Sequence, residues 1–279
     1  MTQRTAQASL AAVIRFRDSE KTLPSVLAAL DAQTRRPDVI VGIDNGSRDG
    51  SRQMLIDHGA TVIDWTEPYH VSRVLNAGIA ACASDLVLIV SSHTVLEDPG
   101  TVARYVATMA DADVACVSAR PPGYARLPES IDWETVARNG LTYCSIYSNS
   151  HGMIRRAFWA ELPFDDRLGV AAEDYCWALE QLKRGRRVAM LPVSYRYLKR
   201  GRAPHAATLR AVLAVGRHFG LPMGWLGVKR TALAAALALV RVVGTAGRSA
   251  AQRDDLAKHL GHLRGWWRWR RHDPFRARR

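Results

Sequence analysis

The sequence lacks several features by which common protein classes are recognised. No C-x-x-C pair occurs among its four cysteines, Cys82, Cys116, Cys144 and Cys176, so neither a zinc site nor a disulfide framework is expected. The N-terminal residues show no long apolar segment of a secretory signal. The apolar run at 231–240 is far shorter than the roughly 20 residues that span a bilayer. These absences favour a cytoplasmic protein with reduced thiols, peripheral on a membrane at most.

Two common nucleotide-binding signatures are also missing. The phrase GIDNGSRDGS at 42–51 follows a strand-like run, but it contains neither the Gly-Lys-Ser of a P-loop nor a G-x-G-x-x-G fingerprint. It reads instead as a tight polar turn, in which Asp44 and Asn45 are placed to hydrogen-bond a nucleotide base or ribose. Turn chemistry alone explains the same residues, so this phrase by itself decides nothing.

Acidic residues are scarce relative to basic ones. The chain of 279 residues has 39 Lys and Arg against 26 Asp and Glu, for a net charge of +13. Such a balance favours anionic partners. The tail WWRWRRHDPFRARR at 266–279 mixes tryptophan and arginine, which suits an anionic membrane surface. A disordered basic terminus and a nucleic-acid contact are the alternatives, and nucleic acid is the least favoured because only the charge supports it.

Strand-like and helix-like segments alternate along the first part of the chain. Strand patterns occupy 9–16, 38–44, 60–65, 85–92 and 113–120, and helical patterns occupy 22–33, 51–59, 71–83 and 98–111. This alternation predicts an α/β fold with a mostly parallel central sheet and helices on both faces. Residues 121–150 look like a loop-rich insertion suited to acceptor binding, 151–159 like a strand, and the chain beyond about 205 like helices.

Two polar clusters stand where chemistry is expected. Ser91, Ser92 and His93 follow a fully apolar strand, and ligands of open α/β sheets bind at the carboxyl ends of strands. Glu173 and Asp174 open a helix that ends near Gly185. Acids in a first helical turn also favour the helix dipole, so capping competes with a role as general base.

The order of these phrases resembles the family 2 glycosyltransferases of GT-A fold. The similarity rests on VIRFRDSEKTLPSVLAALDAQTRRPDVIVGIDNGSRDGS, then RVLNAGIAACASDLVLIVSSHTVLED, then FDDRLGVAAEDYCWALEQLKRGRRV, and it covers residues 9 to about 200. It implies a GT-A domain at 8–200 and a helical extension with the basic Trp/Arg tail at 201–279. The implied activity is inverting transfer of a sugar from a nucleotide-sugar to a hydroxyl acceptor, in bacterial surface polysaccharide or glycolipid assembly.

The resemblance also implies roles for particular residues. The acidic pair Glu173–Asp174 matches the family's catalytic acids, with Asp174 as the expected base and Glu173 as its neighbour or as a partner of the acceptor hydroxyl. The positions that match donor-binding residues are Arg15, Arg17, Asp44, Asn45, Asn76, Ser91, Ser92 and His93.

The metal motif departs from the family pattern, because Ser91-Ser92-His93 stands in place of Asp-x-Asp. A rhamnosyltransferase-like subset of the family looks similar here. Either His93 binds a divalent metal such as Mn or Mg, imidazole suiting Mn better, or no metal is used and His93 joins Arg15 and Arg17 in stabilising the leaving diphosphate. We prefer the first alternative slightly. His205 is a second candidate for the metal or phosphate site, on even terms with a solvated histidine.

Two further expectations stay open. His151 is placed to approach the donor sugar, whereas His58, His70 and His218 are interpreted as solvated or capping residues. The lost Asp-x-Asp also leaves room for a catalytically degenerate protein that only binds a nucleotide-sugar or lipid. For an active enzyme, the expected partners are a nucleotide-sugar donor and a glycan or lipid-linked acceptor.

Overall fold

The computed structural model describes residues 8–120, 128–139, 146–198 and 205–221, with a few isolated positions between 236 and 275. Its contacts divide the chain into two compact units. The first comprises Met1–Gly169 and Glu173–Arg200, and the second Val170–Ala172 and Gly201–Arg279. The first unit contains the large sheet and the predicted site residues other than His205.

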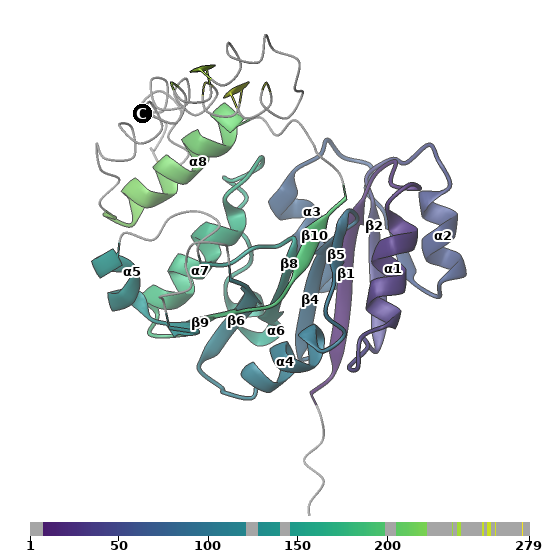
Figure 1. The fold of residues 1–279 in the computed structure, drawn as a ribbon, viewed down its shortest axis with the longest axis horizontal. Coiled ribbons are helices and arrows are strands. Elements are labelled where there is room, and N and C mark those ends of the chain that lie inside the picture. Colours follow the sequence, from purple (N-terminus) through teal and green to yellow (C-terminus); the bar gives the residue numbers. More distant parts are fainter. Residues whose placement is uncertain are drawn as a thin grey trace, which may run out of the picture. The chain divides into compact units, whose positions relative to one another are not determined.

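One half of the large sheet is parallel, as the alternating pattern predicts. Its strands stand in the order β3-β2-β1-β4 and run in the same direction (Figure 1). Their bounds are β1 Leu10–Phe16, β2 Val39–Asp44, β3 Thr61–Asp64 and β4 Leu86–Ser91, joined by α1 Leu23–Asp31, α2 Ser51–Asp57 and α3 Val71–Ala80. Every residue of β4 is buried, because this strand lies inside the sheet with helices over it.

The other half of the sheet is mixed. Strand β8 (His151–Arg155) pairs antiparallel with both β4 and β6 (Val114–Ala119), and β9 (Arg187–Leu191) runs parallel to β6. A short β7 (Ser130–Ile131) closes this edge. Strand β5 (Thr94–Leu96), which begins directly after His93, pairs antiparallel with β10 (Tyr195–Tyr197) in a separate two-stranded sheet. The central sheet is therefore mostly parallel, as expected, with an antiparallel insertion that the sequence pattern does not reveal.

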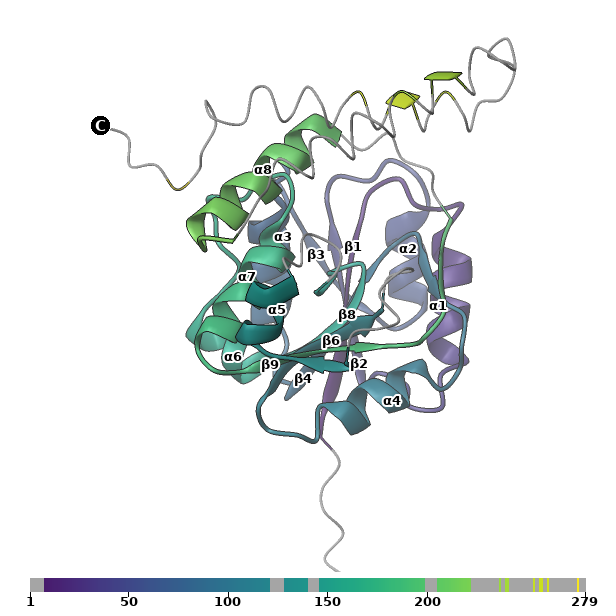
Figure 2. The same ribbon diagram turned by 60° about the vertical axis from the view of Figure 1, so that its left-hand side comes forward.

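Helices pack on both faces of the sheet, because successive apolar side chains of each strand point to opposite faces. On one face, β1 residues such as Leu10 and Ile14 share a core with apolar residues of α1 and α4 (Thr101–Thr108). On the other face, α3 lies against Val13 and Ile43. Helix α7 (Glu173–Lys183) packs near β6 and β9, and the two views agree on its place beside that half of the sheet (Figure 2).

Two expectations about local structure need correction. Residues 151–159 form a strand only as far as Arg155, after which α6 (Arg156–Glu161) begins. The stretch 121–150 is not all loop, since its described part contains β7 and α5 (Trp133–Asn139). Helix α5 starts where Asp132 accepts a hydrogen bond from the Thr135 backbone N–H at 2.8 Å, an N-cap arrangement.

The second unit contributes one longer described helix, α8 (His205–His218). The basic tail at 266–279 lies outside the described residues except for Phe275, whose ring stacks on His218 at 4.3 Å between centroids. Over the described part of the chain, no helix combines the length and the apolar character that a membrane span requires.

Gly78 gives a test of how closely α3 packs on the sheet. A Cβ at this position would meet the side chain of Ile43 and lie 2.9 Å from Val13 Cγ1. We expect Gly78→Ala to lower the free energy of unfolding by about 1–3 kcal/mol, because overpacking outweighs the gain in helix propensity. Denaturant unfolding measures this, with Ala80→Ser at an exposed position of the same helix as a control. A stabilised Gly78→Ala protein would contradict the packing.

Candidate active site

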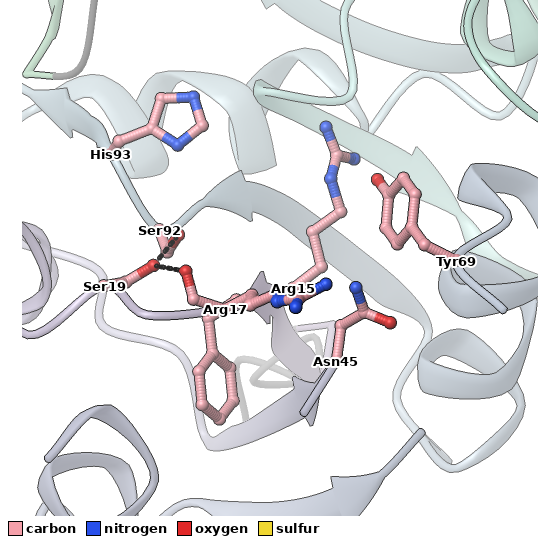
Figure 3. A pocket seen from close by; sticks show the side chains of 8 residues that line it. Arg15, Arg17, Ser19, Asn45, Tyr69, Ser92 and His93 are labelled. Atoms are coloured by element: carbon pink, nitrogen blue, oxygen red, sulfur yellow. Dashed lines mark hydrogen bonds between the residues drawn. The ribbon is translucent and has the colours of Figure 1, made fainter. Parts of the chain in front are cut away.

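A pocket of about 320 Å³ opens at the carboxyl ends of β1, β2 and β4. Strand β2 pairs on one side of β1 and β4 on the other, so the chain leaves these strand ends in opposite directions. The crevice between diverging segments of this kind is the usual ligand site in an open α/β sheet. The residues around it are Arg15, Phe16, Arg17, Ser19, Asn45, Tyr69, Ser92 and His93 (Figure 3). Five predicted donor-binding residues thus share one pocket.

The pocket lining is cationic. It holds the guanidinium groups of Arg15 and Arg17 and the imidazole of His93, and none of the described residues that line it carries a carboxylate. Figure 3 shows Arg15 and Arg17 reaching into the space beside Asn45 and Tyr69. An anionic ligand such as a diphosphate matches these groups, because guanidinium presents paired N–H donors to phosphate oxygens.

Polar contacts fix the segment after β4. The Thr22 hydroxyl donates to the Ser92 carbonyl at 2.7 Å, and the hydroxyls of Ser19 and Ser92 are 2.8 Å apart. Thr22 stands at the N-cap of α1 without a side-chain capping bond, and its hydroxyl bonds the end of β4 instead. The Leu198 backbone N–H donates to the His93 carbonyl at 2.8 Å. His93 is therefore held in place by two separate parts of the chain.

Asp44 supports the pocket from behind rather than lining it. Its carboxylate is buried and accepts the Ser47 backbone N–H at 2.8 Å. Gly46 between them has φ of +75°, a left-handed value that glycine adopts without strain. The bond thus shapes the turn that presents Asn45 to the pocket.

Asn76, predicted to bind the donor, holds a loop through its side-chain amide. Its Nδ2 donates to the Phe164 carbonyl at 2.8 Å, and its Oδ1 accepts from Trp159 Nε1 at 2.9 Å and from the Phe164 backbone N–H at 3.0 Å. It is also absent from the pocket lining. Through these contacts Asn76 anchors the segment that leads to α7, and its predicted role in donor binding stays a prediction.

Glu173 and Asp174 form a buried pair at the start of α7, with exposed fractions of 4% and 5%. Asp174 accepts backbone N–H groups from Asn149 at 3.2 Å and from Tyr175 at 2.8 Å. Burial, and after it the charge of Glu173, raise the pKa of Asp174 to about 7. A carboxyl group with such a pKa suits general base catalysis near neutral pH.

Several neighbouring groups act on the charge of Glu173. Burial raises its pKa, while Arg15, Asn149 and His70 act in the opposite direction. Ala172, just before the pair, has φ of +71°, a strained conformation for a residue with a side chain. Arg15 therefore links the pocket to the acidic pair electrostatically.

Sequence reasoning missed some contributors to this site. His70, interpreted as solvated or capping, precedes α3 and acts on the charge of Glu173. A Cβ at Gly169 would lie 2.7 Å from its Nε2 atom, so the glycine makes room for the ring. Tyr69, Phe16 and Ser19 line the pocket. The only signal for His70 and Tyr69 was their place directly before a helix.

The remaining histidines stay apart from the pocket lining. His151 is buried, and its ring stacks on Tyr195 with 3.9 Å between centroids. Burial lowers the pKa of His151 to about 4, so the side chain is neutral and part of the core. His58 pairs with Asp31 at 3.4 Å. His205 begins α8 in the second unit, and its role as a metal or phosphate ligand stays a prediction.

The pocket offers a divalent metal few ligands. Its lining supplies one imidazole, that of His93, beside two guanidinium groups. Within the residues that the structure describes, no three His, Cys, Asp or Glu side chains lie together so that they could hold a metal ion. Mg²⁺ and Mn²⁺ prefer carboxylate and other oxygen ligands. Among the described residues, the pocket side chains therefore do not by themselves make up a ligand set for a divalent metal. The metal roles of His93 and His205 stay predictions.

Comparison with known proteins identifies relatives of this arrangement. Residues 11–159 match the family described as glycosyl transferase family 2. No curated protein matches the sequence. A mannosyltransferase from Pyrobaculum calidifontis, solved with GDP-Man and Mn²⁺, is 15% identical, with a TM-score of 0.67 over 96% of this chain and 88% of that one.

Two other solved structures share the fold. Glucosyl-3-phosphoglycerate synthase from Mycobacterium tuberculosis, in complex with Mn²⁺, UDP and glucosyl-3-phosphoglycerate, is 19% identical, with a TM-score of 0.59 over 78% of this chain and 82% of that one. TarS from S. aureus is 15% identical, with a TM-score of 0.56 over 82% of this chain and 43% of that one. At such identities the likeness shows a common fold.

The buried acid makes the stability of the fold depend on pH. The pKa of Asp174 is about 7 in the folded chain against an ordinary 3.8, so the folded state binds this proton more tightly than the unfolded state. The resulting stability is present below about pH 4 and is lost as the pH rises to about 7. At pH 8 we expect Asp174→Asn to unfold with a free energy about 2–4 kcal/mol higher than the wild type.

Denaturant unfolding at pH 5 and pH 8 measures this difference. Asp166→Asn is the matched control, because Asp166 is exposed and pairs with Arg73 at the surface. The gain from Asp174→Asn should shrink toward pH 5, while the control should show no gain at either pH. Parallel pH profiles for wild type and Asp174→Asn would contradict the tight proton binding.

Proposed function

The chain belongs to glycosyl transferase family 2 and is a glycosyltransferase of GT-A fold, and we propose that it transfers a sugar with inversion from a nucleotide-sugar to a hydroxyl acceptor. The observation that carries the proposal is the pairing of a cationic pocket at the β1–β4 strand ends with a buried carboxyl pair. Arg15 lines the pocket and also acts on the charges of both acids.

Asp174 is the base in this mechanism. It takes the proton of the acceptor hydroxyl as the oxygen attacks the anomeric carbon. The bond from that carbon to the diphosphate oxygen breaks, and the electron pair leaves with the nucleoside diphosphate. A single displacement of this kind inverts the anomeric configuration. Because the pKa of Asp174 is about 7, it is ionised in a large share of molecules at neutral pH and still has a high affinity for the proton.

Fixed cations meet the charge that develops on the leaving diphosphate. Arg15 and Arg17 supply guanidinium N–H donors from the β1 end, and His93 supplies an imidazole from the β4 end. Such preorganised groups stabilise developing charge without rearrangement during the reaction. Solved relatives hold Mn²⁺, whereas the ligand set here suits direct recognition of phosphate. We therefore favour the metal-independent alternative over His93 as a metal ligand.

The acceptor in this proposal is a glycan or a lipid-linked sugar of a bacterial surface polysaccharide or glycolipid. Tyr69 lines the pocket and is 48% exposed, which suits a wall for a sugar ring. The basic tail at 266–279 is suited to the anionic inner face of a membrane, where lipid-linked acceptors reside.

Removal of the base tests the proposal. With the cognate donor and acceptor, Asp174→Asn should lower kcat by about 10²- to 10⁴-fold and leave nucleotide binding within about twofold. Glu173→Gln should cost less, because it removes a charge next to the base but leaves the base itself. Asp166→Asn serves again as the control. Full activity of Asp174→Asn would remove the base assignment, and donor binding without turnover in the wild type would favour a degenerate binding protein.

Chelation tests the metal-independent alternative. Nucleotide release from a panel of UDP-, GDP- and dTDP-sugars should survive EDTA, and the Kd of the nucleoside diphosphate should stay within about twofold on addition of Mn²⁺. Arg15→Gln should weaken binding of the nucleoside diphosphate about tenfold or more, because one charge-assisted contact is lost. Loss of release in EDTA, restored by Mn²⁺, would return His93 to the role of metal ligand.

A further inference from the structure

Asn149 is a buried residue that contacts both acids of the pair. It lies just before β8, and its exposed fraction is 1%. Its backbone N–H donates to Asp174 Oδ2 at 3.2 Å, and its side-chain Nδ2 donates to Glu173 Oε1 at 3.3 Å. The two contacts differ in kind, because every residue except proline would keep the first and only the amide side chain makes the second.

The carbonyl oxygen of the Asn149 side chain also indicates that the amide is there for its contact with Glu173. The Oδ1 atom of Asn149 is buried and has no hydrogen-bond partner among the residues described. A buried carbonyl oxygen without a partner costs free energy, so a residue that only filled this space would be better apolar. The Nδ2 contact with Glu173 is what the side chain contributes.

Other groups that face the pair also bear on its protons. Arg15 from β1 and His70 from the start of α3 favour the ionised form of Glu173. The Cys116 thiol of β6 and the Tyr147 hydroxyl lie near Asp174, and burial raises the pKa of both well above the ordinary range, so they stay neutral. The backbone N–H of Glu173 itself also stabilises the negative charge of Glu173, and Asn149 adds a side-chain hydrogen bond to the carboxylate.

We propose that Asn149 is a positioning residue for the base: its side-chain amide keeps Glu173 ionised, and the charge of Glu173 makes Asp174 a stronger acceptor for the proton of the attacking hydroxyl. This inference rests on the proposed function, in which Asp174 is the base. Asn149 itself neither gains nor loses a proton, and it acts only through Glu173. The two acids thus divide their tasks, one holding a charge and the other moving a proton.

Two substitutions at this position have opposite expected effects. Asn149→Ala removes the hydrogen-bond donor to Glu173, so Glu173 takes up a proton more readily. A neutral Glu173 no longer repels negative charge on Asp174, and the titration midpoint of Asp174 should therefore fall by about one pH unit. Asn149→Asp is nearly isosteric and brings a new carboxylate. Glu173 and the new aspartate then share at least one negative charge beside Asp174, and the titration midpoint of Asp174 should remain at or above the wild-type value. A purely structural role predicts that both variants leave the midpoint unchanged or disturb it alike.

The experiment measures the titration and the rate in the full-length protein. Carboxyl carbon NMR of ¹³C-aspartate protein, with the Asp174 signal identified by its loss in Asp174→Asn, gives the midpoint without any substrate. The pH profile of kcat gives the second readout. For Asn149→Ala we expect the acidic limb to move down by about one pH unit, kcat on the plateau to fall about tenfold, and KM for the donor to stay within about twofold. Ser148→Ala, in the same loop and bonded to Ser150, is the matched control.

The outcomes separate this inference from the function on which it rests. An Asp174 midpoint that is the same in Asn149→Ala and wild type overturns the positioning role. An Asp174→Asn protein that keeps its transfer rate overturns the base assignment, whatever the midpoints are. Should Asn149→Ala fail to fold, Asn149→Ser replaces it, because its hydroxyl is too short to reach Glu173 and the same fall in midpoint is expected.

Discussion

The reversal of strand order at β1 is the constraint on which the site depends. Since β2 pairs on one side of β1 and β4 on the other, the segments that follow these strands diverge, and a hollow must form between their ends. The polar contacts of Ser19 and Thr22 with Ser92 keep the hollow from widening by tying the end of β4 to the loop after β1. This arrangement brings Arg15, Arg17 and His93 to one pocket from the ends of two neighbouring strands.

The parts of the fold that follow from local pattern could be predicted from the sequence. The strands at Leu10–Phe16 and Leu86–Ser91 are buried apolar runs, and their polar ends correctly indicated the pocket. The antiparallel insertion of β8 between β4 and β6 could not be predicted, because pairing direction depends on where a strand meets the sheet and not on its own residues. The end of that strand at Arg155 was missed because helix α6 begins at the very next residue, Arg156, with no turn residue between the two elements.

Among the predicted site residues, those at strand ends lie together around the pocket, and their roles stay predictions. Asn76 carries the residue type of a ligand, yet its amide bonds Trp159 and Phe164, and no sequence pattern shows which partner an amide selects. His70 and Asn149 were missed because their importance comes from nearness to Glu173, which is more than twenty residues distant from each along the chain. Contacts of this range are decided by the packing of α7 against the sheet.

The two unusual features of the site compensate for each other electrostatically. Arg17 pairs with the exposed Asp18 at 3.7 Å. At the end of β4 this chain has Ser91, Ser92 and His93, so this strand end adds no carboxylate to offset the positive charge of Arg15 in the pocket. That charge extends to the buried pair, where Arg15 lowers the cost of ionising both Glu173 and Asp174. With an aspartate in place of His93, the same arginines would be partly neutralised and two buried acids would be harder to ionise. Under the proposed function, the Ser91-Ser92-His93 segment and the deeply buried acidic pair are consistent parts of one charge distribution, in which fixed cations would serve both the diphosphate and the base.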